Sequence, residues 1–288
     1  MEPAASAPYS RSSLTLPDGV EDRVATSRHY VMCPPDYFEV TYAINPWMDP
    51  AAPVDVDRAR RQWEALGDVY RDLGHRVSLV DPVPGLPDMV FAANGALVVG
   101  GHVYGARFRN AERAAEAPAY AAWFAAAGYP VHGPTYVNEG EGDFLTLDEV
   151  ILAGTGFRTD RAAHAEAAAV LGRPVVTLEL VDPRFYHLDT ALFPLDGRRI
   201  AYYPGAFSAA SREWLAGRFP DAVLAGPADA AAFGLNSVSD GENVVISADA
   251  ADLALELKRR GFTPVPVDLS EFRKAGGGPK CCTLEIRK

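Results

Sequence analysis

The chain has 288 residues, of which 48% are hydrophobic and 23% are charged, and its formal net charge is −11 at pH 7. This composition is typical of a globular protein without a membrane span, and its acidic charge disfavours nucleic acid as a partner because phosphate backbones require a basic surface. With three cysteines and no secretion signal at its start, we expect a cytoplasmic protein whose partner is a small molecule.

The elements follow one another in a repeating order. Residues 1–26 are rich in Ala, Ser and Pro and lack periodicity, which predicts a disordered leader before a single α/β domain over residues 27–288. Helices are expected over 55–73, 111–127, 161–171, 209–217 and 250–260, and each of them except the fourth is followed directly by a glycine that suits a helix C-cap. Hairpins are expected between them, pairing 96–99 with 103–105, 144–146 with 150–152, 191–194 with 200–202, and 237–239 with 244–246.

A polar residue precedes each hairpin at a nearly constant interval. The positions are Asn94, Asp143, Asp189 and Asn236, with Asn45 and Cys281 at comparable places, and successive positions differ by 45 to 49 residues. Such a period indicates a repeat architecture. Because each unit contains a helix as well as a hairpin, we expect an α/β propeller of about five ββαβ units whose pre-hairpin residues converge on one axis. A two-domain Rossmann arrangement is the alternative.

Three segments carry residues suited to chemistry. A glycine run, 276–278, leads to Lys280, Cys281 and Cys282, and a thiol beside a cation suits a nucleophile, although a buried core cysteine is the plainer alternative. His187 stands two positions from Asp189, so both face one side of an extended segment. Residues 139–143 place carboxylates on a glycine-rich turn. The remaining histidines are scattered without metal-ligand spacing, so no metal is expected.

Together these motifs resemble the guanidino-group-modifying enzymes of the pentein, or amidinotransferase, superfamily. The resemblance runs from His29 onward and rests on segments 87–91, 139–143, 187–190 and 277–281. Segments 32–35 and 44–48, with residues 93–94, are most similar to the arginine dihydrolases, which release two ammonia molecules from arginine and leave ornithine. The resemblance implies a five-bladed α/β propeller with neither metal nor cofactor.

The resemblance also implies roles for particular residues. Cys281 would attack the guanidinium carbon, and His187 would act as acid and then as base, oriented by Glu139 or alternatively by Glu141. Substrate-binding residues would be Asp88, Asn94, Asn45, Asp143 and Asp189, with Arg113 and Arg158 binding the amino-acid carboxylate. The alternative for Arg113 is a surface position on its helix.

We therefore expect a hydrolase that works through a cysteine thiouronium intermediate. The main expectation is conversion of arginine to ornithine, ammonia and CO₂, or to citrulline, because the uncharged Asn94 would let the pocket accept a neutral ureido group. The alternatives are a dimethylarginine dimethylaminohydrolase, an amidinotransferase and a non-catalytic binding domain. The sequence leaves open whether the chain forms a homo-oligomer.

Overall fold

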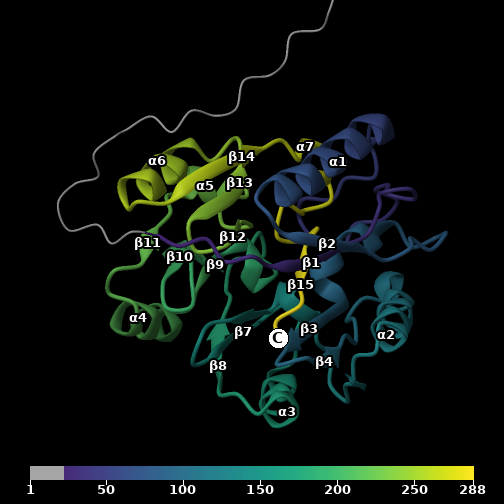
Figure 1. Ribbon diagram of the computed structural model, residues 1–288, viewed down its shortest axis with the longest axis horizontal. Helices are drawn as coiled ribbons and strands as arrows, with labels where there is room; N and C mark the ends of the chain where they lie inside the picture. Colours follow the sequence, from purple (N-terminus) through teal and green to yellow (C-terminus); the bar gives the residue numbers. More distant parts are fainter. Residues whose placement is uncertain (1–22) are drawn as a thin grey trace, which may run out of the picture.

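The computed structural model describes residues 23–288, which form five three-stranded sheets arranged around a common axis (Figure 1). Most of the expected leader, residues 1–22, lies outside the described residues. At its end, Thr26 donates its backbone N–H to the carbonyl of Asp240 at 2.9 Å. No helix within residues 23–288 is long and apolar enough to cross a membrane.

Four of the sheets follow the chain in order. Each consists of an antiparallel hairpin and a third strand that runs parallel to the second strand of the hairpin. They are β3 (Ala96–Val99), β4 (His102–Gly105) and β5 (Val131–His132); β6 (Phe144–Thr146), β7 (Ile151–Thr155) and β8 (Val175–Glu179); β9 (Leu192–Pro194), β10 (Ile200–Tyr202) and β11 (Val223–Leu224); and β12 (Val238–Ser239), β13 (Asn243–Ser247) and β14 (Thr263–Val267).

The fifth sheet joins the two ends of the chain. β15 (Leu284–Glu285) pairs antiparallel with β1 (His29–Met32), and β1 pairs parallel with β2 (Arg76–Leu79). Cys281 therefore precedes the first strand of the fifth hairpin. The expectation that Asn45 holds a comparable place is wrong, because Asn45 lies in the loop after β1 and the hairpin partner of β1 comes from the C-terminal end of the chain.

The longer helices lie on the outer rim of the ring, where each connects the second and third strands of one sheet (Figure 1). They are α1 (Val56–Asp72), α2 (Glu116–Ala126), α3 (Arg161–Leu171), α4 (Ala209–Arg218) and α6 (Ala251–Arg259). The expected C-cap glycines at 74, 128, 172 and 261 all have positive φ, between 63° and 85°, which glycine adopts without a steric penalty. The expected helix over 111–127 is interrupted, since a 3₁₀ turn, η3 (Ala111–Arg113), precedes α2.

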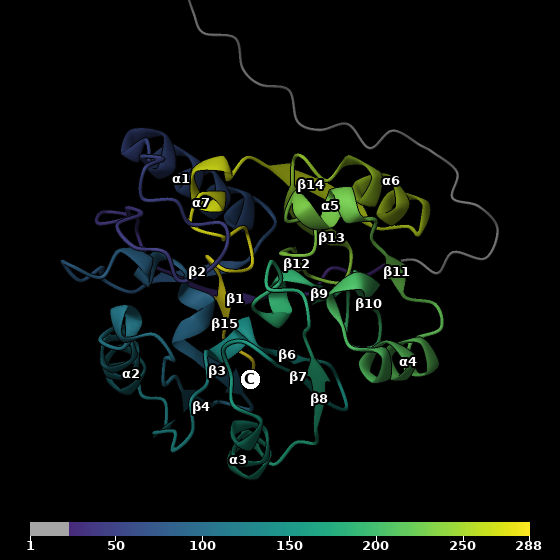
Figure 2. The same cartoon turned by 180° about the vertical axis from the view of Figure 1, so that it is seen from behind.

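Short helical turns bring the polar pre-hairpin residues to the axis. They are η1 (Pro87–Val90), η2 (Ala92–Gly95), η4 (Gly140–Gly142) and η5 (Leu188–Thr190), while η6 (Pro204–Ala206) lies after β10. α5 (Pro227–Ala231) and α7 (Ser270–Arg273) lie on the face turned away from the viewer in Figure 1 and are seen in Figure 2. The expected five-bladed α/β propeller is confirmed, and the Rossmann alternative is wrong because no sheet formed by residues 23–288 has more than three strands.

Candidate functional site

Cys281 is held on the axis by a neighbouring repeat. The Asn236 side chain accepts the backbone N–H of Cys281 through Oδ1 at 3.0 Å, and its Nδ2 lies 3.1 Å from Cys281 Sγ. The thiol in turn donates to Asp189 Oδ2 at 3.4 Å. The sequence-based site omitted Asn236, although its place in the repeat was a signal that could have found it.

The sequence neighbour of the thiol, Lys280, contacts other groups. Lys280 Nζ donates to Glu141 Oε2 at 2.6 Å and to the carbonyl of Thr283 at 2.8 Å, so its charge is already paired. Lys280 therefore forms an ion pair with Glu141 and makes no hydrogen bond to the Cys281 thiol in the described chain. Burial raises the pKa of Cys281 well above its ordinary value, and the Asp189 carboxylate raises it further.

Glu139 and His187 form a buried pair. His187 Nε2 lies 2.7 Å from Glu139 Oε2, and the same oxygen accepts Arg158 Nη1 at 3.0 Å. Burial opposes ionisation of Glu139, but Arg158 and the hydrogen bond to His187 prevail and hold the pKa of the carboxyl below its usual value. Of the two glutamates considered from the sequence, Glu139 contacts His187, whereas Glu141 is paired with Lys280.

Asn94 links this pair to a second buried ion pair. Its Oδ1 accepts Arg113 Nη1 at 2.8 Å, and its Nδ2 donates to the carbonyl of Glu139 at 3.2 Å. Arg113 is 4% exposed and forms two hydrogen bonds of 2.8 Å with Glu116, so the alternative of a surface position is wrong. Sequence reasoning missed Glu116, and its spacing of three residues from Arg113 was the available signal.

Three buried aspartates gather around the same centre. Asp88 Oδ2 accepts from the Tyr42 hydroxyl at 3.0 Å, and Asp143 Oδ1 accepts the backbone N–H of Leu188 at 3.0 Å. Burial raises the pKa of all three carboxyl groups, to about 6 for Asp143 and about 7 for Asp189. Within residues 23–288, one oxygen of Asp88 and one of Asp189 have no hydrogen-bond partner. Buried acceptors of this kind favour a ligand that is a hydrogen-bond donor and a cation.

The loop after β1 covers these residues. Its Ile44 carbonyl accepts Arg158 Nη2 at 2.8 Å, Asn45 Nδ2 donates to the carbonyl of Ala275 at 3.0 Å, and Trp47 Nε1 donates to the carbonyl of Arg184 at 2.8 Å. The loop therefore contacts segments that connect the strands of different sheets. Asn45 meets the glycine run rather than the nucleophile itself.

Close packing at the centre requires a glycine. A Cβ atom at Gly142 would lie 2.2 Å from Asn94 Nδ2 and 3.3 Å from the His187 ring, so only glycine lets these two side chains approach this turn. Within the part of the chain that the structure describes, no group of three or more His, Cys, Asp or Glu side chains could hold a metal ion. The site therefore combines a thiol, a histidine–glutamate pair and three buried aspartates.

Proteins of known name share this chain's sequence and fold, although no family model matches it. The N(G),N(G)-dimethylarginine dimethylaminohydrolase of Mycobacterium tuberculosis is 58% identical over 92% of this chain and 87% of that protein. The bifunctional arginine dihydrolase/ornithine cyclodeaminase ArgZ of Synechocystis sp. is 39% identical over 89% of this chain, which spans only 37% of that protein's length.

A solved structure extends the likeness to three dimensions. The N-terminal domain of ArgZ bound to product, an arginine dihydrolase from cyanobacteria, matches with a TM-score of 0.88 and 37% identity, covering 91% of this chain and 98% of that one. The family that these comparisons indicate is consistent with the five-sheet ring and with the central thiol and histidine–glutamate pair. The chain belongs to the pentein superfamily of guanidino-group-modifying enzymes and is a hydrolase acting on the C–N bonds of linear amidines.

Proposed function

We propose that this chain hydrolyses N-methylated arginine to citrulline and an alkylamine, with Cys281 as the nucleophile. The observation that carries the reaction is the contact between Cys281 Sγ and one oxygen of Asp189, whose other oxygen has no partner among the described residues. A guanidinium bound to Asp189 would place its carbon beside the thiol.

The bound cation would also activate the nucleophile. Because burial and Asp189 raise the pKa of Cys281, the free protein holds the thiol protonated at neutral pH. A guanidinium supplies the missing positive charge, which favours the ionised forms of both Cys281 and Asp189. Asp88 and Asp143 would complete the cation site. Arg113 and Arg158 remain the proposed carboxylate ligands.

Each step balances without a cofactor. His187 takes the thiol proton as the thiolate adds to the guanidinium carbon, and the resulting tetrahedral centre expels the alkylamine, which takes this proton from His187. This leaves a planar thiouronium on Cys281. His187 then takes a proton from water as the oxygen attacks that carbon, and collapse of the second tetrahedral centre releases the thiolate and the ureido group of citrulline. Glu139 holds the histidine ring in place through the 2.7 Å contact.

The choice of methylated arginine reverses the order expected from the sequence. Its support is the 58% identity to a protein named for dimethylarginine, against 39% for one named for arginine. Arginine dihydrolysis stays the second candidate because Asn94 is a neutral amide held between Arg113 and the Glu139 carbonyl. Such an amide accepts a neutral ureido group more readily than a carboxylate would.

Product analysis tests both candidates. The purified chain is incubated separately with asymmetric dimethylarginine and L-arginine, and the products are identified by mass spectrometry, with Cys281→Ser as the inactive control. Citrulline and dimethylamine from the methylated substrate are expected. Ornithine and ammonia from arginine, without turnover of dimethylarginine, would contradict the proposal and establish the second candidate. Turnover only when an acceptor amine is added would indicate an amidinotransferase, and no turnover with any amine would favour a binding domain.

A further inference from the structure

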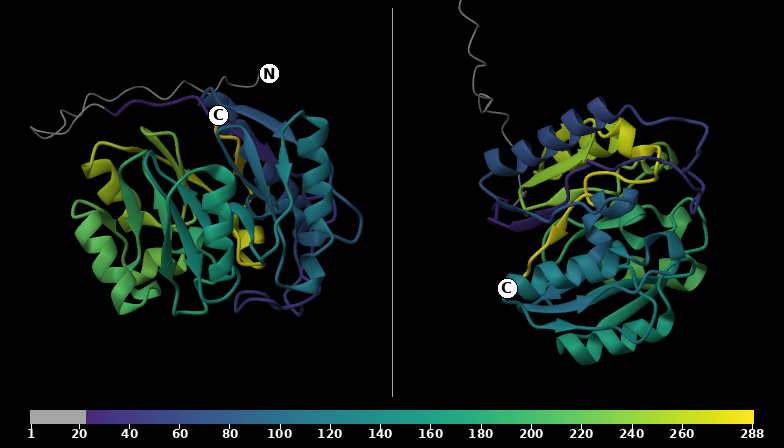
Figure 3. Two further views of the ribbon diagram at one scale, coloured as in Figure 1. Left: turned by 90° about the horizontal axis from the view of Figure 1, so that it is seen from below. Right: turned by 90° about the vertical axis from the view of Figure 1, so that its right-hand side faces the viewer.

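A cavity lies at the other end of the ring axis from the catalytic residues. The catalytic residues precede the first strand of each hairpin, whereas this cavity of about 880 Å³ is lined by residues of the strand-connecting turns, including Gly100, Asp148 and Gly197, and by the last residues of the chain. In the left view of Figure 3 the C-terminus lies at one end of the short axis and the yellow helix α7 at the opposite end. We call this space the axial cavity.

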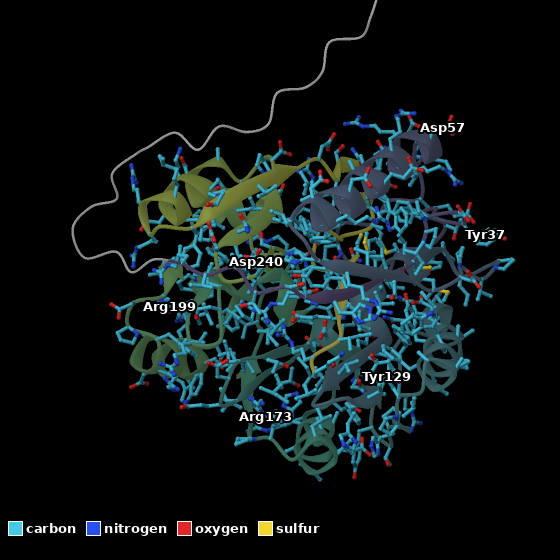
Figure 4. All side chains as sticks on the ribbon, viewed as in Figure 1. Tyr37, Asp57, Tyr129, Arg173, Arg199 and Asp240 are labelled. Carbon is cyan, nitrogen blue, oxygen red and sulfur yellow. The ribbon has the colours of Figure 1, made fainter. Side chains whose placement is uncertain are left out.

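The axial cavity is basic in an acidic protein. Six cationic side chains line it, and only three acidic ones: Arg28, Arg76, Arg173, Lys280, Arg287 and Lys288, against Asp148, Asp196 and Glu285. Figure 4 shows Arg173 beside α3. The chain as a whole carries a net charge of −11. The sequence total therefore conceals a local excess of positive charge.

Part of this positive charge has no counter-ion in the described structure. Glu285 pairs with Arg28 at 3.4 Å and with Arg287 at 2.6 Å. Arg76 and Lys288 form no ion pair with any residue from 23 to 288. Burial lowers the pKa of His29, and the nearby positive charges of Arg76 and Lys288 lower it further. The mouth of the cavity therefore has a positive potential that attracts anions.

The unpartnered polar atoms at the two ends of the axis differ in kind. Near the catalytic centre they include carboxylate oxygens, as at Asp189. Among residues that line the axial cavity all of them can donate. Two are guanidinium nitrogens, Arg28 Nε and Arg287 Nε, and two are the hydroxyls of Tyr30 and Thr146, and all four are buried without a hydrogen-bond partner in the described chain. Buried donors without partners are costly and favour an acceptor-rich ligand.

We propose that the axial cavity binds a small, multiply charged phosphate-bearing anion. Its volume lies in the range of small-molecule sites, and arginine guanidinium groups such as those of Arg28 and Arg287 match the geometry of phosphate oxygens. The site is separate from the acidic catalytic pocket, which suits a cation. Neither the reaction nor its substrate calls for this site.

One residue connects the two ends. Lys280 lines the axial cavity, pairs with Glu141 at 2.6 Å and is followed directly by Cys281. An anion in the cavity competes with Glu141 for the Lys280 ammonium group. Binding there therefore acts on a residue next to the nucleophile in the chain without competing with the guanidino substrate, whose site lies on the other side of this pair.

Calorimetric titration with pyrophosphate at constant ionic strength tests the proposal. Wild type is compared with Arg76→Gln/Lys288→Gln, and the matched control is Arg61→Gln/Arg212→Gln, two exposed arginines away from the cavity. We expect saturable binding that weakens roughly tenfold or more in the cavity variant and stays unchanged in the control. Equal weakening in both variants, or no saturable binding, would overturn the proposal.

Two further measurements sharpen the result. Thr146→Val removes a hydroxyl that has no partner in the described chain, so the variant should be as stable as wild type without ligand and bind pyrophosphate more weakly. Unchanged affinity would count against the site. Citrate at matched charge distinguishes phosphate from carboxylate, and equal affinity for citrate would overturn the phosphate assignment. Inhibition by pyrophosphate that is competitive with the guanidino substrate would place the anion in the catalytic pocket and also overturn it.

Discussion

Removing the Asn236 side chain should disable the nucleophile without removing any residue of the acid–base pair. In Asn236→Ala, the Cys281 backbone N–H loses its acceptor and Sγ loses the Nδ2 donor at 3.1 Å. The N–H···S contact favours the ionised thiol, because the donor meets a negative charge only after deprotonation. The thiolate should therefore become harder to form.

The size of the effect follows from the contact. A hydrogen bond to a charged group contributes about 1.5–3 kcal/mol, which corresponds to a rise of about one to two units in the Cys281 pKa. At neutral pH the fraction of thiolate, and with it kcat/KM, should fall about 10- to 100-fold. The lost backbone hydrogen bond should also lower the free energy of unfolding by about 1–3 kcal/mol.

Both effects can be measured separately. The pH dependence of kcat/KM and the rate of iodoacetamide alkylation report on the thiolate, and thermal unfolding reports on stability. Ser237→Ala is the matched control, since Ser237 Oγ donates to the Gly234 carbonyl at 2.7 Å and makes no hydrogen bond to Cys281. If Asn236→Ala kept the wild-type pH profile while losing stability like the control, Asn236 would be merely structural and the reasoning would be refuted.

Three other outcomes are expected. Burial raises the pKa of Asp189 to about 7, from about 4 in the unfolded chain, so the free energy of unfolding falls as the pH rises between these values. Asp189→Asn should therefore be inactive, and its melting temperature should exceed that of wild type at pH 7.5 and equal it near pH 4. Equal melting temperatures at pH 7.5 would contradict this. Gly142→Ala should lower kcat/KM at least about 100-fold, because the new Cβ would overlap the Asn94 side chain. In the control, Gly133→Ala, no atom lies near the new Cβ, and kcat/KM should be unchanged. Near-normal activity of Gly142→Ala would refute the packing argument. The rate at which iodoacetamide alkylates Cys281 in the free protein should keep rising with pH up to about pH 9. A rate that levels off near neutral pH would instead reveal a thiolate formed before substrate binds.

Local patterns in the sequence predicted the repeat well. Glycine C-caps and hairpin turns act through backbone geometry within a few residues, so they can be recognised without knowing the rest of the fold. The helix over 161–171 was predicted to the residue. The interval between pre-hairpin residues indicated a ring because a constant period places equivalent residues at equivalent positions in successive units.

Contacts between distant segments were decided only by the tertiary structure. The pairing of β15 with β1 determined that Cys281, and not Asn45, occupies the fifth pre-hairpin place. The sequence favoured Glu139 as the partner of His187 and left Glu141 as the alternative, and the structure separated them by pairing Glu141 with Lys280.

The sequence by itself determined which residue types stand at each repeat and hence the guanidino chemistry of the family. Only the fold decided their charge states, because a pKa depends on burial and on charges that are distant along the chain. The axial cavity has the same origin. Its cations lie far apart in a sequence that is acidic overall, and closure of the ring by the two chain ends brings them to one end of the axis.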